Sequence, residues 1–456
     1  MRWSGSGPTP DTKPSAAPPS PAIVGQTPAW TSALRSRPAV RAAATAKWDL
    51  LLVCVGVYIA TAVGRVHQLF PVLLLLKPTL VASVLGIGLY LLQQSGVRTV
   101  DRLRTPTTSC LLGLVLWTAL SVPGALNQGI AFTTLTGFLK TVVMCFVIAG
   151  SVRTLRDVER LILVYFAVTA VYAAVVLSRF QLGQDSWRLG RLYNYDANDF
   201  ATLIACAMPL GLYFVLGQRR LLLRMLALAG LAALAVGEIY SGSRGGFLAL
   251  AAVTGFVLVR FTTLPVRSRL VGLVVILGIV LGAASDRYWT EMQTVLKPHE
   301  DYNITADAGR LKIWERGVGY MWSNPVLGVG AGNFQFAEGN ISPLARLQEH
   351  GKGVLWGAAH NSLIQVGAEL GLPGLVFFVG VIATAFASLR RLARYGRRLG
   401  PAAIAVPRLA QSLMAALVGF SVGGFFLSLA FSEMLYPLAA LAVALEKVTL
   451  PRPIPR

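Results

Sequence analysis

The chain has 456 residues, of which 55% are hydrophobic and only 13% are charged, and its mean hydropathy is +0.62. Soluble globular proteins carry about 25% charged residues, so this composition excludes an ordinary soluble protein and favours membrane burial. The net charge of +21 would fit nucleic-acid binding in a soluble chain, but the basic residues fall mostly in short loops between apolar runs, where topology and anionic lipids account for them; no nucleic-acid partner is expected.

Residues 1–47 differ from the rest of the chain because they are rich in Pro, Ser, Thr and Ala. No apolar core of signal-peptide length follows the first basic residue, so a cleavable signal peptide is not expected. The composition predicts a disordered cytoplasmic tail. The first apolar run is then expected to serve as an uncleaved membrane-targeting signal.

Twelve apolar runs of about spanning length follow, which predicts an all-α polytopic membrane protein with about twelve transmembrane helices. Nine are expected within 48–284 and three within 360–450, separated by a large loop over 285–359. Lys and Arg concentrate in alternate loops, so both termini are expected in the cytoplasm and the large loop in the periplasm of a bacterial inner membrane. The expected runs are roughly 49–64, 72–92, 108–123, 130–149, 161–178, 198–216, 222–239, 245–260, 270–284, 361–388, 409–430 and 433–449.

Two lysines interrupt the apolar runs. Lys77 precedes Pro78 in the second run, which predicts a weak or kinked span. Lys140 lies within the fourth run, where a lone lysine is costly. It is expected either to serve function or to snorkel or pair inside the bundle.

A polar segment precedes the sixth run. Asn198 or Asp199 is expected to cap the helix of that run. Asn194 and Asp196 are candidates to bind sugar hydroxyls.

Residues 241–246, Ser-Gly-Ser-Arg-Gly-Gly, lie between the seventh and eighth runs and predict a tight turn in which Arg244 opens a helix. Small residues allow a backbone or a ligand to approach closely. The N–H groups of a helix start beside a guanidinium make a good phosphate site. The alternative is a hairpin turn with a snorkelling arginine.

Residues 310–321, in the large loop, predict an amphipathic helix that ends at Asn324-Pro325. Its apolar face, which includes Trp314, is expected to lie toward lipid at the membrane surface. Arg310 is a candidate anion ligand; the alternative is that it belongs to a solvated charged face.

His360 stands where the large loop re-enters the membrane, and Asn361 or Ser362 is expected to cap the helix that follows. A histidine there can act near neutral pH as a general base or as a neutral hydrogen-bond donor. The alternative is an interfacial histidine with a satisfied hydrogen bond.

The sequence motifs of nucleotide-binding, hydrolase and metal sites are absent or incomplete. The glycine-rich residues 328–332 lack the Lys-Ser/Thr of a P-loop and are expected outside the cytoplasm. The sequence has no HExxH motif and no G-x-S-x-G elbow, and its four cysteines lie within apolar runs without metal-ligand spacing. Neither a metal nor a cofactor is expected, so any reaction must use an activated donor already in the membrane.

Five segments, taken in order and spacing, resemble the O-antigen ligase and polymerase family of membrane glycosyltransferases. The resemblance covers about residues 185–380 and reaches the rest of the chain through topology alone. It implies a GT-C-like arrangement of about twelve helices with a periplasmic loop over a lipid-facing cavity. The segments are Asn194–Phe200, Ser241–Gly246, Gly309–Trp314, Asn324–Gly330 and His360–Gly374.

The resemblance also implies a reaction: transfer of a glycan from undecaprenyl diphosphate to an acceptor hydroxyl, without metal or nucleotide. The functional residues of the family fall here on Arg244, Arg310 and His360. Two guanidinium groups would stabilise the leaving diphosphate, the imidazole would deprotonate or orient the acceptor hydroxyl, and back-side attack would invert the anomeric carbon. Further candidates for diphosphate or sugar binding are Arg191, Asn194 and Asn361.

The sequence does not distinguish between three kinds of acceptor. An O-antigen ligase of lipopolysaccharide biosynthesis, a polysaccharide polymerase and a protein O-oligosaccharyltransferase use the same lipid-linked donor, with a lipid, glycan or protein acceptor. The alternative from another class is a polysaccharide or lipid transporter or flippase. Transporters usually show repeated halves and midplane charges, whereas this sequence shows no internal repeat and its charged candidates cluster at one face.

Overall fold

Backbone N–H and C=O groups inside a membrane must pair within their own segment, which favours helices. The computed structural model describes residues 47–94, 96–179, 188–189, 195–217, 220–297, 306, 309–345, 356–400 and 403–450, and these contain helices and no extended strand. The expected N-terminal tail lies outside the described residues. The α-helices are α3 (Leu50–Ala62), α4 (Val66–Leu69), α5 (Pro71–Leu75), α6 (Pro78–Leu92), α7 (Pro106–Ser121), α8 (Gln128–Ser151), α9 (Leu155–Arg179), α10 (Ala197–Gly217), α11 (Leu221–Ser241), α12 (Arg244–Arg260), α13 (Val266–Ala283), α14 (Asp286–Gln293), α16 (Arg310–Ser323), α17 (Phe334–Asn340), α19 (Ser362–Arg398), α20 (Ala405–Gly424) and α21 (Leu435–Thr449).

The protein is a polytopic helical membrane protein. Within the described part, seven helices are long and apolar enough to cross a membrane, and three shorter helices are also apolar. Eleven of the twelve expected runs contain one helix each, and the second run contains two, α5 and α6. That all twelve cross the membrane, with residues 285–359 as one periplasmic loop, stays a prediction.

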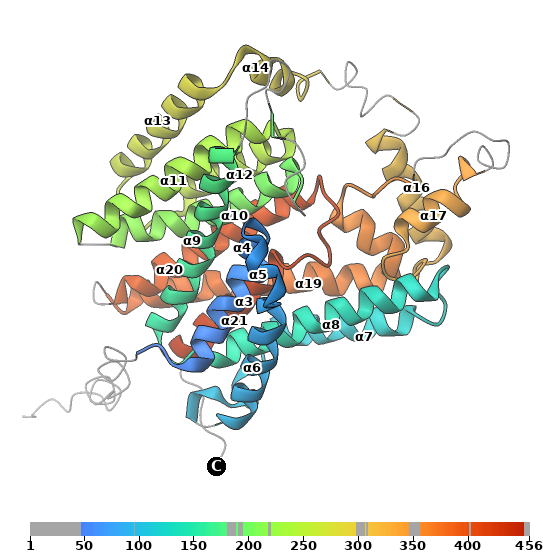
Figure 1. Ribbon diagram of the computed structural model, residues 1–456, viewed down its shortest axis with the longest axis horizontal. Helices are drawn as coiled ribbons and strands as arrows, with labels where there is room; N and C mark the ends of the chain where they lie inside the picture. The colour runs from blue at the N-terminus through green and yellow to red at the C-terminus, as the bar shows by residue number, and fades with distance from the viewer. Residues whose placement is uncertain are drawn as a thin grey trace, which may run out of the picture. The chain divides into compact units, whose positions relative to one another are not determined.

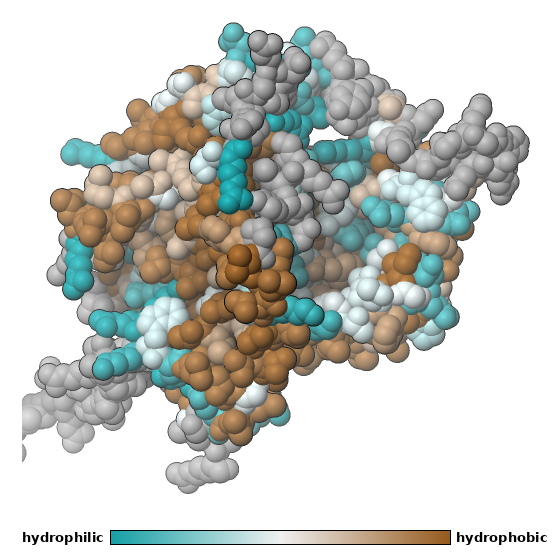
Figure 2. Space-filling view, in the orientation of Figure 1, coloured by the Kyte–Doolittle hydropathy of each residue, from teal (hydrophilic) through white to brown (hydrophobic). Residues whose placement is uncertain are grey.

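Helices α10 and α20 form the centre of the bundle, since 78% and 72% of their most apolar windows are buried. Helix α13 lies at the edge (Figure 1), with none of its residues buried and several of its Leu and Val side chains exposed. Figure 2 shows apolar residues gathered on the surface over α3 to α6 and a more polar surface around α16 and α17. Exposed apolar side chains on such helices are expected to face lipid.

The second expected run is broken at Lys77, as its Lys-Pro pair predicts. Helix α5 ends at Leu75, Lys77 has a φ of 42°, and Pro78 is the first residue of α6. Proline suits the first helical position but removes a hydrogen-bond donor, so it starts α6 instead of continuing α5.

Helix α19 is also broken, at Gly371, whose φ is 68°. The glycine-rich residues 328–332 pack backbone to backbone against this break: the N–H of Val329 donates to the carbonyl of Ala368 at 2.9 Å. A Cβ on Gly328 would lie 2.3 Å from the carbonyl carbon of Glu369, so only glycine fits there. Residues 328–332, which lack a P-loop signature, thus join the large loop to α19.

Helix α16 confirms the predicted amphipathic helix, but its apolar face does not turn toward lipid. Ile313, Gly317 and Tyr320 are buried, and Phe334 and Ile364 pack against them. The expected lipid-facing orientation was wrong because α17 and α19, which are distant in sequence, supply a protein surface for this face.

Candidate active site

The turn between α11 and α12 has the expected form. Gly242 caps α11 with a φ of 57°, a left-handed conformation that favours glycine. The Ser243 hydroxyl accepts a hydrogen bond from the N–H of Gly246 at 3.1 Å and caps α12. Arg244 is therefore the first residue of a helix whose positive dipole end lies at this turn.

The Arg244 side chain is held against helix α14 of the large loop. Its Nη1 donates to Thr294 Oγ1 at 2.7 Å, and its Nε lies 3.5 Å from Glu291 Oε1. The Arg244 side chain is only 17% exposed and that of Glu291 is 32% exposed. The guanidinium of Arg244 is thus held beside the carboxylate of Glu291. An incoming anion would have to compete with this carboxylate for the guanidinium.

Three arginines from different parts of the chain line one cavity of about 140 Å³. They are Arg188, Arg244 and Arg310; Glu291 and Asn198 line it too. The first residues of α12 form another part of the wall, so their helix dipole adds to the positive potential. Three guanidinium groups against one carboxylate make this a site for an anion, and its volume suits a headgroup better than a whole ligand.

His360 lies just before α19, in a backbone conformation that is unusual for a residue with a side chain. Its φ is 46°, and its N–H donates to Ser428 Oγ at 2.9 Å. Next to it the Ser362 hydroxyl donates to the Leu427 carbonyl at 2.7 Å and accepts from the N–H of Leu429 at 2.9 Å. These bonds to the α20–α21 connection fix the turn that carries the imidazole.

The imidazole of His360 is electrostatically coupled to Arg310. Burial, and then the positive charge of Arg310, lower the pKa of His360, while Asp196 acts in the opposite direction. Trp314, one turn after Arg310, donates from Nε1 to the Ala359 carbonyl at 3.0 Å, which docks α16 beside the histidine turn. At neutral pH the imidazole is therefore kept in its neutral form, which can accept a proton.

The three expected catalytic residues lie at the same end of the bundle. Arg244 and Arg310 line one cavity, and His360 is near enough to Arg310 to feel its charge, although it does not line that cavity. Arg191 and Asn194 lie outside the described residues.

Asn361 takes the capping role. Its Oδ1 accepts hydrogen bonds from the N–H groups of Leu363 at 2.9 Å and Ile364 at 3.1 Å. The residue is 1% exposed, which favours a role in holding the histidine turn over direct contact with a sugar.

The expected cap of α10 was wrong. Neither Asn198 nor Asp199 caps the helix; Asp196 Oδ1 accepts hydrogen bonds from both of their N–H groups at 2.8 Å. The helix therefore begins at Ala197, one residue before the apolar run, with Asp196 as its cap. Asn198 is thereby left to line the cavity, where its Oδ1 lies 3.5 Å from Arg188 Nη2.

Two residues of this site, Glu291 and Arg188, were not predicted from sequence patterns. Glu291 lies in the large loop and meets Arg244 only through the packing of α14 on the bundle. Arg188 stands in a stretch with two arginines, and only the folded chain shows that a hydrogen bond from the N–H of Leu189 to the Tyr240 carbonyl places it beside α11. Hydropathy and local motifs carry no information on such distant pairings.

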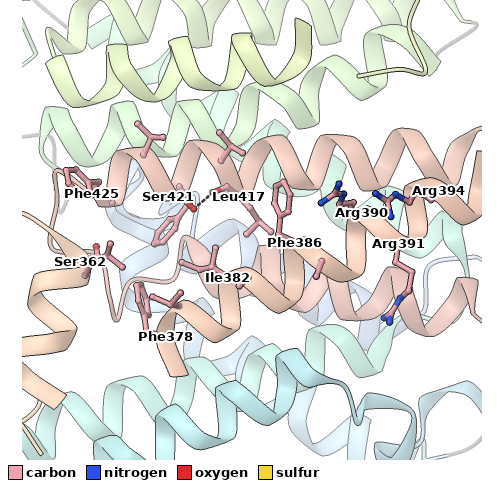
Figure 3. A pocket seen from close by; sticks show the side chains of 18 of the residues that line it. Ser362, Phe378, Ile382, Phe386, Arg390, Arg391, Arg394, Leu417, Ser421 and Phe425 are labelled. Carbon is pink, nitrogen blue, oxygen red and sulfur yellow. Dashed lines mark hydrogen bonds between the residues drawn. The ribbon is translucent and has the colours of Figure 1, made fainter. Parts of the chain in front are cut away.

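A long groove of about 1040 Å³ runs between α19 and α20 (Figure 3). Ser362 and Phe425 lie at one end, next to the histidine turn, and arginines including Arg390 and Arg394 lie at the other. The wall between them is mostly aromatic and aliphatic, as Phe378 and Phe386 illustrate. Such a groove in a membrane protein suits a hydrocarbon chain.

Comparison with known proteins adds one match. Residues 229–379 match the family model described as O-antigen ligase, and this range includes Arg244, Arg310 and His360. A search of curated proteins found no match.

Proposed function

We propose that this chain transfers a glycan from undecaprenyl diphosphate to an acceptor hydroxyl on the periplasmic side of the bacterial inner membrane, because its residues 229–379 match the family model described as O-antigen ligase. The family suggests glycosyltransferase activity of the ligase or polymerase type. The observation that most strongly supports transfer is the shared cavity of Arg188, Arg244 and Arg310, which suits a lipid diphosphate.

The cavity arginines bind the diphosphate of the donor. As the bond between the anomeric carbon and the diphosphate oxygen breaks, negative charge grows on that oxygen, and Arg244 and Arg310 stabilise it. The fixed position of Arg244 means that its guanidinium needs little reorganisation during the reaction. The positive charge that a metal ion would otherwise supply comes from the guanidinium groups.

His360 acts as the general base for the acceptor hydroxyl. The acceptor oxygen forms the new bond to the anomeric carbon, and its proton passes to the neutral imidazole. Attack from the face opposite the leaving diphosphate inverts the configuration. Undecaprenyl diphosphate leaves with both electrons of the broken bond.

The groove between α19 and α20 is a natural place for the polyprenyl tail of the donor. Its end at Ser362 and Phe425 adjoins the turn of His360, and Phe425 precedes Phe426, which lines the cavity. A tail lying there would hold the diphosphate next to the arginines and leave the glycan toward the large loop.

The test uses purified protein in liposomes with an undecaprenyl diphosphate-linked glycan and a candidate acceptor, either lipid A–core or a second lipid-linked repeat. Wild-type protein is expected to form product with one of them, which separates ligase from polymerase. Arg244→Ala and His360→Ala should lower the rate by about 100-fold or more, as for loss of a transition-state donor or a general base.

The matched control is Arg267→Ala, an exposed arginine at the start of α13. It should transfer at the wild-type rate, and all variants should insert equally. If wild-type protein moves the lipid-linked glycan across the bilayer and forms no product, it is a transporter. Equal product from Arg244→Ala, His360→Ala and wild type would remove the assigned mechanism.

A further inference from the structure

A second cavity, of about 680 Å³, lies between α3, α6 and α8 and has no part in the scheme above. Arg65 and His67, after α3, and Lys140 of α8 line it, with Glu433 as its carboxylate. Leu80 and Val84 of α6, both more than half exposed, lie along its apolar part. A cavity with cations and an apolar side open to lipid fits an anionic lipid.

Three side-chain atoms of residues that line this cavity lack protein partners. Arg65 Nε, His67 Nδ1 and Gln68 Oε1 are buried, and none has a hydrogen-bond partner among the described residues. Lys140 makes no hydrogen bond or ion pair with the part of the chain that the structure describes. Buried polar groups are nearly always satisfied, so these atoms point to a ligand with several acceptor oxygens.

The position of Arg65 is fixed by the fold. Its φ is 47°, a left-handed conformation that is unfavourable for a residue with a Cβ, and its guanidinium lies 4.2 Å from the ring centroid of Tyr195. The Tyr195 hydroxyl donates to the Val63 carbonyl at 2.9 Å, which ties this pair to the end of α3. The guanidinium is thus held against the face of the Tyr195 ring, and its Nε keeps its capacity to bind an anion.

The two cavities lie on either side of one short segment. Tyr195 contacts Arg65 of the second cavity, and Asn198 lines the cavity of the three arginines. Between them Asp196 caps α10 and acts electrostatically on His360. A lipid bound in the second cavity would therefore have its headgroup near the histidine turn.

We propose that the second cavity binds the phosphate group of a lipid, and that this lipid carries the acceptor hydroxyl. This inference rests on the proposed glycan transfer. The phosphate contacts Arg65 and Lys140, and the lipid chains lie along α6. A phosphorylated glycolipid and a second polyprenyl diphosphate share this chemistry, and binding measurements separate them.

The experiment measures lipid binding to purified full-length protein by native mass spectrometry, so it does not depend on transfer. The probes are phosphorylated lipid A, dephosphorylated lipid A and undecaprenyl diphosphate. Arg65→Gln/Lys140→Gln should weaken binding of one phosphorylated probe about tenfold, as expected for lost charge-assisted hydrogen bonds. Dephosphorylated lipid A should be unaffected by the substitutions.

The probe whose binding weakens identifies the lipid that occupies the second cavity. Loss of lipid A binding means a phosphorylated glycolipid, and loss of a second equivalent of undecaprenyl diphosphate, with one retained, means a lipid-linked glycan. Lys77→Gln, an exposed lysine just before α6 that does not line the cavity, is the matched control and should bind as wild type. Lys140→Gln alone keeps the test decisive if Arg65 is needed for folding.

Two results would overturn the proposal. One is wild-type binding of every probe by Lys140→Gln and by the double variant. The other is loss of the same binding event in Arg244→Gln, because that would mean a single site. Failure of glycan transfer with intact two-site binding would instead count against the proposed function.

Discussion

At the residue scale, the site combines fixed guanidinium groups with a neutral imidazole. Arg244 is held by Thr294 and Glu291 before any substrate arrives, so it loses little side-chain entropy on binding. His360 is held through its own backbone N–H and through the cap of Asn361. The Arg244 side chain and the backbone of the histidine turn are thus positioned by contacts that no substrate needs to form.

The lowered pKa of His360 predicts the pH dependence of transfer. A general base works in its neutral form, so kcat/KM for the donor, which reports free enzyme, should fall only below the ordinary histidine value of 6.5. Bound diphosphate adds negative charge near Arg310 and raises the pKa of His360, so the acid limb of kcat should lie at a higher pH than that of kcat/KM. Steady-state rates in liposomes between pH 5 and 8, a window of about three units around the histidine range, measure both limbs.

The control for this profile is His360→Gln, which keeps a polar side chain without a titrating base. Its residual rate should be flat across the same range. An acid limb of kcat/KM above pH 6.5 in the wild type, or an identical limb in the variant, would show that His360 is not the group that titrates.

At the element scale, the start of α12 carries Arg244 only if that helix packs tightly on its neighbours. A Cβ on Gly246 would lie 2.4 Å from the Cβ of Ala201 in α10 and 2.4 Å from a carboxylate oxygen of Glu238 in α11. The methyl of Ala201 cannot move aside without moving α10. Glycine at this position therefore sets the distance between α12 and the centre of the bundle.

Gly246→Ala should destabilise the protein by about 1–3 kcal/mol through overpacking and should lower transfer, because the first turn of α12 shifts with Arg244. Gly255→Ala is the matched control, since a Cβ there meets nothing within 4 Å in the same helix. It should be neutral or stabilising by up to about 1 kcal/mol. Thermal unfolding in detergent and transfer in liposomes check both; equal stability of the two variants would contradict the packing argument.

At the scale of the whole molecule, apolar runs predict helices far better than they predict contacts. Each of the twelve expected runs contains a helix, and the break at Lys77-Pro78 follows from local chemistry. The turn of Arg244 and the cap by Asn361 also follow from residues within a few positions. Features that the sequence misses depend on distant packing: the protein-facing side of α16, the pairing of Glu291 with Arg244, and Arg188 in the cavity.

The same limit applies to function. Motif order predicted a resemblance to the O-antigen ligase family, whose model matches residues 229–379, and the structure brings Arg244 and Arg310 to one cavity with His360 close by. No local pattern shows that Arg65 and Lys140, which lie 75 positions apart by their numbers, line a second cavity. A lysine inside an apolar run is costly, so the sequence marks Lys140 as a candidate functional residue. It does not show which residues surround Lys140 in the folded chain.

The most direct test of the account is the affinity of purified protein for undecaprenyl diphosphate in lipid nanodiscs. Arg244→Gln and Arg310→Gln should each weaken binding about tenfold or more, because each removes a charge-assisted contact to the diphosphate. Arg267→Gln should leave the affinity unchanged, and undecaprenol, which lacks the diphosphate, should not distinguish the variants. Wild-type affinity for undecaprenyl diphosphate in both cavity variants would contradict the claim that these arginines hold the donor.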